Sequence, residues 1–133
     1  MKLLNQRATL LLISLLLTFI ILRVFLYFLP STNLDVGIYN IHHLYTGILL
    51  MMIGGIPLVI LQGKGRILDA ATIIFGIGLS LALDEWVYLI ATDGSDTAYW
   101  LPVSVWGGVI MVGVAMIILI AVLLIFRNQQ GTE

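Results

Sequence analysis

The sequence contains no cysteine and few charged residues, and both shortages narrow the functions open to it. Without cysteine it cannot form disulfides, thiol redox pairs, thiolate-held iron–sulfur clusters or cysteine-ligated zinc sites. Only 10% of its 133 residues are charged, against about a quarter in a typical soluble domain. The net charge of −1 gives no basic surface for nucleic acid. Because 61% of the residues are hydrophobic and the mean hydropathy is +1.13, we expect an integral membrane protein whose main partner is the lipid bilayer.

Four long apolar segments occupy most of the chain, at about 8–29, 39–61, 67–91 and 101–126. Each can cross a hydrocarbon core, which needs about 20 helical residues. Backbone polar groups in lipid must be bonded internally, so we expect helices. Short connections favour antiparallel packing of consecutive helices. The sequence therefore predicts an all-α fold in which residues 1–133 form a single membrane-spanning domain, an up-down four-helix bundle.

Basic residues outside the predicted spans lie at one end of the bundle only. They are Lys2, Arg7, Lys64, Arg66 and Arg127, whereas the other two connections carry only the acidic residues Asp35, Asp93 and Asp96. The positive-inside rule then places both termini and the 62–66 loop in the cytoplasm, so we expect a multi-pass protein of the plasma (inner) membrane. The first apolar run is about 22 residues long, beyond the length of a signal peptide's apolar region, and we expect it to be retained.

Polar residues inside the spans gather in one layer near the outer ends of the predicted helices. The set comprises Arg23 in the first span, His42 and His43 in the second, Asp84 and Glu85 in the third, and Ser104 in the fourth. With a rise of about 1.5 Å per residue, their depths below the outer ends are about 5–12 Å. A charge inside the membrane costs about 3 kcal/mol or more, so we predict that these groups share one site.

Small residues at helical spacing predict which faces point into the bundle, because close helix contacts in lipid use small side chains. The three series are His43, Gly47 and Gly54; Gly76, Ser80 and Asp84; and Ser104, Gly108 and Ala115. His42 and Glu85 lie about 100° round their helices and reach the same site from its rim.

Two acidic side chains against one arginine leave the predicted site with one excess negative charge. A protonated carboxyl, a protonated histidine or a bound cation would relieve it. An ion-pair network that only fixes helix register is the structural alternative. Asp69, in the first turn of the third span beside Lys64 and Arg66, is instead expected to complement the helix dipole.

Three functions remain open for this site. His42, His43, Asp84 and Glu85 are a sufficient ligand set for a divalent metal ion such as Zn²⁺ or Fe²⁺, although adjacent helical histidines diverge by about 100°. Around them, the side chains predicted to line an outward-facing pocket for a cation or small polar ligand are Arg23, Tyr45, Tyr88 and Ser104. The second function is a proton-coupled small-molecule transporter. The third is an accessory or assembly subunit that packs against another membrane protein or a second copy.

Catalytic activity stays open, because no nucleophile–base pair stands out in the sequence. The segment 93–97 resembles half of a calcium loop but lacks its length and its terminal glutamate. We expect instead a turn in which Asp96 or Thr97 caps the fourth helix.

Two segments carry a resemblance to other proteins. They are Ile41-His42-His43-Leu44-Tyr45-Thr46-Gly47 and Gly76-Ile77-Gly78-Leu79-Ser80-Leu81-Ala82-Leu83-Asp84-Glu85. The chain resembles a set of uncharacterised small four-span integral membrane proteins with a His-His…Gly motif on helix 2 and Gly-x-Gly-Leu…Asp-Glu on helix 3. The resemblance covers roughly helices 2 to 4. It implies that the two pairs belong to one site, and it implies no particular chemistry.

Overall fold

The computed structural model describes residues 2–29, 35–36, 39–63 and 65–130, and the side chains of 6–29, 41–63 and 65–125. Its helices are α1 (Lys2–Phe28), α2 (His43–Ile60), α3 (Arg66–Ala91) and α4 (Pro102–Gln130). The two-residue strands β1 (Asp35–Val36) and β2 (Tyr39–Asn40) pair antiparallel before α2, and a 3₁₀ turn, η1 (Ala98–Trp100), precedes α4.

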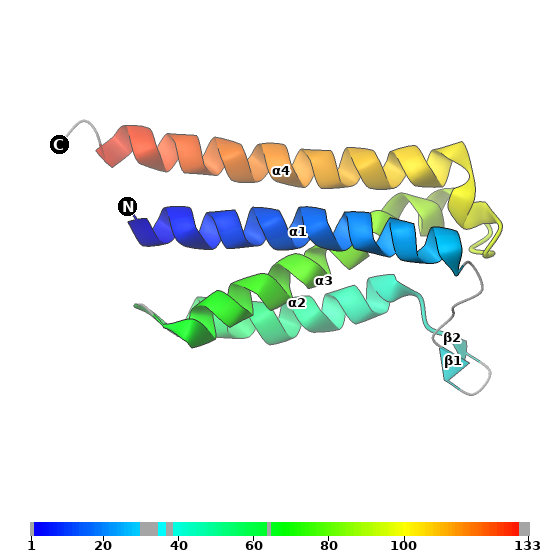
Figure 1. Cartoon of the computed structure of the whole chain (residues 1–133), viewed down its shortest axis with the longest axis horizontal. Helices are drawn as coiled ribbons and strands as arrows, with labels where there is room; N and C mark the ends of the chain where they lie inside the picture. Colours follow the sequence, from blue (N-terminus) through cyan, green and yellow to red (C-terminus); the bar gives the residue numbers. More distant parts are fainter. Residues whose placement is uncertain (1, 30–34, 37–38, 64, 131–133) are drawn as a thin grey trace.

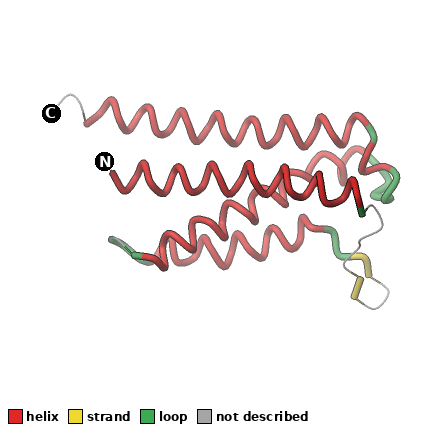
Figure 2. Tube along the Cα trace, viewed as in Figure 1, coloured by secondary structure: helices red, strands yellow, loops and turns green. Residues whose placement is uncertain are grey.

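The four helices run alternately up and down, which confirms the predicted bundle. The beginning of α1, the end of α4 and the turn between α2 and α3 lie at one end of the molecule. The end of α1, the beginning of α2 and the α3–α4 connection lie at the opposite end (Figures 1 and 2). All four helices are long and apolar enough to cross a membrane. The fold is therefore that of a multi-pass helical membrane protein.

Helix α3 is the centre of the bundle. It packs against α2, α1 and α4, and α1 also contacts α4. Within the described residues α1 and α2 make no extensive contact, so the expectation that consecutive helices are always neighbours fails for this pair. Small residues explain the arrangement, because Gly76 and Gly78 are buried on different sides of α3 and allow a separate helix to approach each side.

The contact between α2 and α3 brings two backbones together. A Cβ atom added to Gly47 would lie 2.6 Å from the carbonyl oxygen of Gly78, and one added to Gly54 would lie 2.6 Å from the carbonyl oxygen of Ala71. Both distances are too short for any side chain, so these positions require glycine. The inward faces predicted from Gly47, Gly54 and Gly76 are confirmed.

The beginning of α2 differs from the prediction, whereas α4 begins within one residue of it. Helix α2 begins at His43 rather than near residue 39, and His42 has an extended backbone immediately before it. Helix α4 begins at Pro102, where the missing N–H of proline costs no helical hydrogen bond. Asp96 and Thr97 both lie ahead of η1 and not directly before Pro102, so the expected capping of the fourth helix by Asp96 or Thr97 is wrong.

The loop before η1 is held by its own side chains instead. The Asp93 Oδ1 accepts hydrogen bonds from the backbone N–H of Ser95 at 3.1 Å and from its hydroxyl at 2.7 Å. These bonds stabilise the ionised form and lower the pKa of Asp93. They shape a turn that returns the chain toward the bundle, where Tyr99 enters.

Asp69 lies in the first turn of α3, as expected, but α1 supplies its partners. The Nε of Arg7 is 3.7 Å from Asp69, and the side-chain amide of Gln6 lies 3.5 Å from the same carboxylate. This pair links α1 to α3 at the end of the bundle that carries the termini (Figure 1).

Candidate functional site

Five ionisable side chains from three helices converge near the end of the bundle opposite the termini. They are Arg23 of α1, His42 and His43 at the start of α2, and Asp84 and Glu85 of α3. We call these five residues the polar cluster. Four pairs of these side chains are in contact, with nitrogen–oxygen distances of 2.6–3.2 Å. The structure therefore brings the five residues together, as predicted.

Asp84 is the fully buried centre of the polar cluster. Its Oδ1 accepts from Arg23, with Nε at 2.7 Å and Nη2 at 2.6 Å. Its Oδ2 lies 3.0 Å from His43 Nε2 and also accepts a hydrogen bond from the hydroxyl of Tyr99. Both oxygens are therefore engaged, and the arginine places a positive charge directly against the buried carboxylate.

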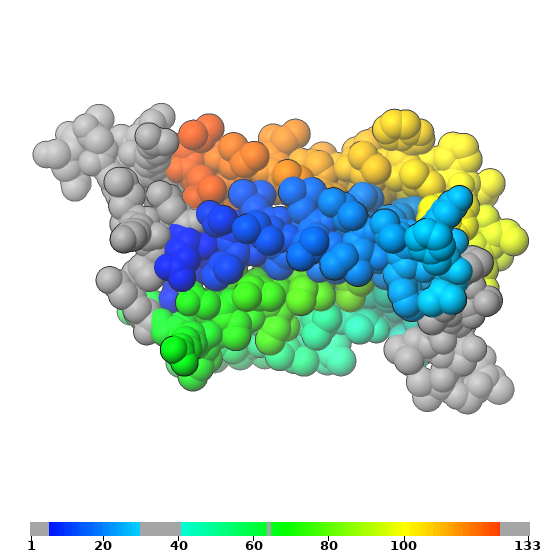
Figure 3. Space-filling model, in the orientation of Figure 1, coloured from blue at the N-terminus to red at the C-terminus, as the bar shows by residue number. Residues whose placement is uncertain are grey.

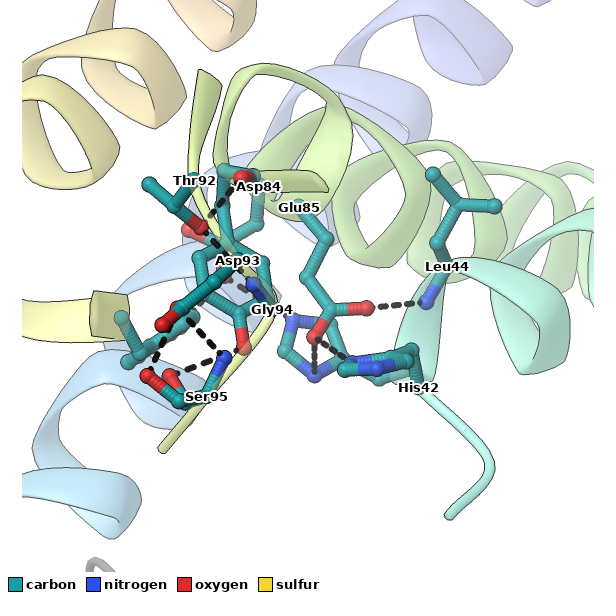
Figure 4. A network of polar contacts seen from close by, with 11 residues as sticks. His42, Leu44, Asp84, Glu85, Thr92, Asp93, Gly94 and Ser95 are labelled. Carbon is teal, nitrogen blue, oxygen red and sulfur yellow. Dashed lines mark hydrogen bonds and ion pairs between the residues drawn. The ribbon is translucent and has the colours of Figure 1, made fainter. Parts of the chain in front are cut away.

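Glu85 faces the beginning of α2, as Figure 4 shows. Its Oε1 lies 3.2 Å from Nδ1 of both His42 and His43, and its Oε2 accepts the backbone N–H of Leu44 at 2.8 Å. That N–H belongs to the first turn of α2, where backbone donors have no partner within the helix. Glu85 thus caps α2 from a neighbouring helix and places negative charge at the positive end of its dipole.

The position of His42 outside α2 corrects the expectation that the two imidazoles diverge by about 100°. That angle applies to neighbours within a helix, whereas His42 has φ −59° and ψ 145°. The extended backbone turns its ring back, so both histidines reach the same carboxylate oxygen. The two rings therefore act on Glu85 together rather than from separate faces.

Arg23 lies in an aromatic and carbonyl environment. Its guanidinium carbon is 4.4 Å from the centre of the Tyr99 ring, and Nη2 lies 3.4 Å from the backbone oxygen of Ser104. Stacking of a guanidinium on an aromatic face stabilises the charge where water is scarce. Its buried Nη1 has no hydrogen-bond partner among the described residues.

Tyr99 is the functional side chain that sequence reasoning missed. It comes from η1, outside the predicted spans, and is buried against Tyr88 with ring centres 5.5 Å apart. Burial and the negative charge of Asp84 both raise the pKa of Tyr99 well above its usual value, so it stays protonated as a donor. All five tyrosines and all three tryptophans fall at or near the outer ends of the predicted spans, which is a signal for such a residue but does not single out Tyr99.

The four predicted pocket residues have different positions. Arg23 is in the polar cluster. Ser104 lies next to it through its backbone oxygen, while its hydroxyl donates to Ala98 O at 2.7 Å and anchors η1. Tyr88 packs its ring against His42 at 5.8 Å and donates its hydroxyl to the backbone oxygen of Ser95. Tyr45 is 58% exposed, and the structure does not bring it to the cluster.

The prediction of a divalent metal site finds no support among the described residues. Among the described residues, no group of three or more histidine and acidic side chains is placed to hold one. The physical reason is at Asp84, where Arg23 occupies the position that a metal cation would take. The prediction that His42, His43, Asp84 and Glu85 ligate Zn²⁺ or Fe²⁺ therefore gains no support from the geometry.

Comparison with known proteins adds no functional label. No protein-family model matches the chain, and no curated protein and no solved structure matches it significantly. The resemblance through the His-His and Asp-Glu motifs stays a prediction.

Proposed function

We propose that this chain is a proton-coupled protein of the plasma membrane, with both termini in the cytoplasm. In this proposal the polar cluster binds and releases a proton near the outer surface. That exchange controls the binding or movement of a cation or small polar ligand. Of the functions open from the sequence, the proton-coupled transporter is the one that the geometry of the polar cluster supports best.

The observation that carries the proposal is the position of the His43 ring. Its Nε2 lies 3.0 Å from Asp84 and its Nδ1 lies 3.2 Å from Glu85. A neutral imidazole has one N–H and one lone pair. With both carboxylates ionised, that lone pair would face a negatively charged oxygen. One additional proton, on His43 or on a carboxyl group, removes the repulsion.

Charge balance leads to the same proton count. Asp84 and Glu85 together carry two negative charges when ionised, and Arg23 carries one positive charge. One further proton makes the polar cluster neutral, which favours its burial within the membrane. Loss of the proton leaves a negative site that attracts a cation or a hydrogen-bond donor. Proton release and ligand binding are thereby coupled.

The histidines provide access to the buried carboxylates. The side chains of His42 and His43 are 22% and 20% exposed, whereas Asp84 is fully buried and Glu85 almost so. An imidazole accepts a proton on one nitrogen and gives one up from the other. His42 therefore exchanges protons with the outer surface, and Glu85 and His43 pass them to Asp84.

Infrared difference spectroscopy between pH 4 and pH 9, on protein in lipid bilayers, tests the proposal. Carboxyl and imidazole bands are recorded for the wild type and for Asp84→Asn, Glu85→Gln and the control Asp69→Asn. Interacting groups titrate as one unit, so we expect each cluster variant to change the imidazole bands. The control should leave them unaltered, because Asp69 lies at the opposite end of α3. Identical imidazole bands in all four proteins would refute proton binding by the cluster.

A further inference from the structure

We propose that the contact between α1 and α3 forms a proton path that connects the polar cluster to the opposite end of the bundle. We call this contact the α1–α3 seam, defined by Asp69, Thr72, Gly76, Ser80 and Asp84 of α3 and by Arg7, Ser14 and Arg23 of α1. The inference rests on the proposed function and extends it by giving the site a second access, from the side of the termini.

The α3 residues of the seam recur every three or four positions, so they lie on one face of the helix. From Asp69 to Asp84 this face extends about 22 Å along the axis. Helix α1 closes it at both ends with the same kind of pair, Arg7 with Asp69 and Arg23 with Asp84. Figure 3 shows α1 lying over the middle of the bundle between α4 and the α2–α3 pair.

Three hydroxyl groups lie between the two ion pairs, and all three residues are buried. Thr72 Oγ1 donates to Leu68 O at 2.7 Å, and Ser14 Oγ donates to Leu11 O at 3.0 Å. Ser14 also lies against Gly76, so α1 places its hydroxyl beside the middle of this α3 face. The hydroxyls thus divide the distance between the ion pairs into shorter steps.

Ser80 indicates that the seam has a role besides packing. It is 0% exposed, and its hydroxyl has no hydrogen-bond partner among the described residues. An unpartnered buried hydroxyl costs about 1–3 kcal/mol, and alanine would pack at a helix contact without that cost. A water molecule bonded to Ser80, one turn from Asp84, would satisfy the hydroxyl and continue the path.

Proton transfer along such a path leaves each hydroxyl with one proton, although Thr72 and Ser14 must open and re-form their bonds to Leu68 O and Leu11 O. A hydroxyl oxygen accepts a proton from the water on one side and gives its own proton to the acceptor on the other. Each hydroxyl then rotates back to its starting orientation, and one proton has moved from the Asp69 end to the polar cluster at Asp84.

Proton flux into liposomes tests the seam. Purified wild-type protein is reconstituted with a pH-sensitive dye inside, and an imposed membrane potential drives proton entry. Ser80→Ala and Thr72→Val remove single hydroxyls from the seam. Thr46→Val is the matched control, because Thr46 is a half-buried hydroxyl residue of α2, outside the seam. Asp84→Asn removes the terminal acceptor, and thermal unfolding checks that every variant is folded.

We expect Ser80→Ala and Thr72→Val to slow the flux about tenfold, equivalent to about 1.4 kcal/mol in the barrier. Thr46→Val should match the wild type, and Asp84→Asn should approach protein-free liposomes. Loss in Asp84→Asn with normal flux in both hydroxyl variants would refute the seam and leave the proposed function intact. Equal slowing by Thr46→Val, or a wild type no faster than protein-free liposomes, would also refute the seam. In those cases the infrared bands still decide separately whether the cluster binds a proton.

Discussion

Substitution of Gly47 by alanine should separate α2 from α3 and disturb the polar cluster without touching it. The added Cβ would lie 2.6 Å from Gly78 O and 2.7 Å from the backbone nitrogen of Ala82. Both are backbone atoms, so no side-chain rotation relieves the contact. Ordinary contact begins near 3.4 Å, and the helices must therefore move apart by about 0.8 Å.

The expected magnitude follows from this movement. Overpacking of a tight contact costs about 1–3 kcal/mol. If the helices move as rigid bodies, the distance from His43 Nδ1 to Glu85 Oε1 grows from 3.2 Å to about 4 Å, beyond hydrogen-bonding range. Gly47→Ala should thus lower the free energy of unfolding and also weaken the shared titration of carboxyl and imidazole bands.

Unfolding by SDS from mixed micelles measures the stability change, and infrared spectroscopy measures the titration. Gly113→Ala is the control, because a Cβ at this α4 position meets nothing within 4 Å. Alanine also has the better helix propensity, so the control should lose no stability. Equal stability of Gly47→Ala and the wild type would refute the close backbone contact between α2 and α3.

Three further substitutions test individual contacts of the cluster. Arg23→Gln leaves the buried Asp84 charge unpaired and should cost about 3–5 kcal/mol in SDS unfolding, with partial recovery on adding Asp84→Asn; an unchanged stability would contradict the ion pair. Tyr99→Phe should reduce the loss of stability above pH 10. Above that pH a tyrosine in the unfolded chain loses its proton, whereas the raised pKa of Tyr99 keeps it protonated in the folded protein. The wild type therefore loses up to about 1.4 kcal/mol of unfolding free energy per pH unit. An equal loss per pH unit in Tyr99→Phe would contradict the burial of Tyr99. Ser104→Ala removes the bond to Ala98 O and should cost about 1 kcal/mol, and no loss would show that the bond does not hold η1 in place.

The sequence was sufficient to predict the spans and the convergence of the polar cluster, because both follow from the energetics of lipid. Apolar length determines the helices, and the cost of isolated charge brings Arg23, Asp84 and Glu85 together. The inward face of α2 was also predictable from its glycines. These inferences needed only helical spacing and the expense of burying polar groups.

Other features depend on tertiary structure that local pattern does not encode. His42 directly precedes the apolar run of α2 and was predicted to lie inside the helix. Its backbone is extended instead, and Glu85 of α3 caps the first turn of α2. Tyr99 reaches Asp84 only because the 92–97 turn and Ser104 fix the position of η1. The central place of α3 follows from glycines on two of its sides, whose partners could not be assigned before the helices were assembled.

Solid-state NMR distances between ¹⁵N-labelled His43 and ¹³C-labelled carboxyl carbons test the central claim most directly. The claim is that one imidazole joins the carboxyl groups of Asp84 and Glu85 inside the membrane. We predict short, strong couplings from Nε2 to the Asp84 carboxyl and from Nδ1 to the Glu85 carboxyl, in wild-type protein in bilayers at neutral pH. A His43 ring that couples to neither carboxyl group would contradict the account.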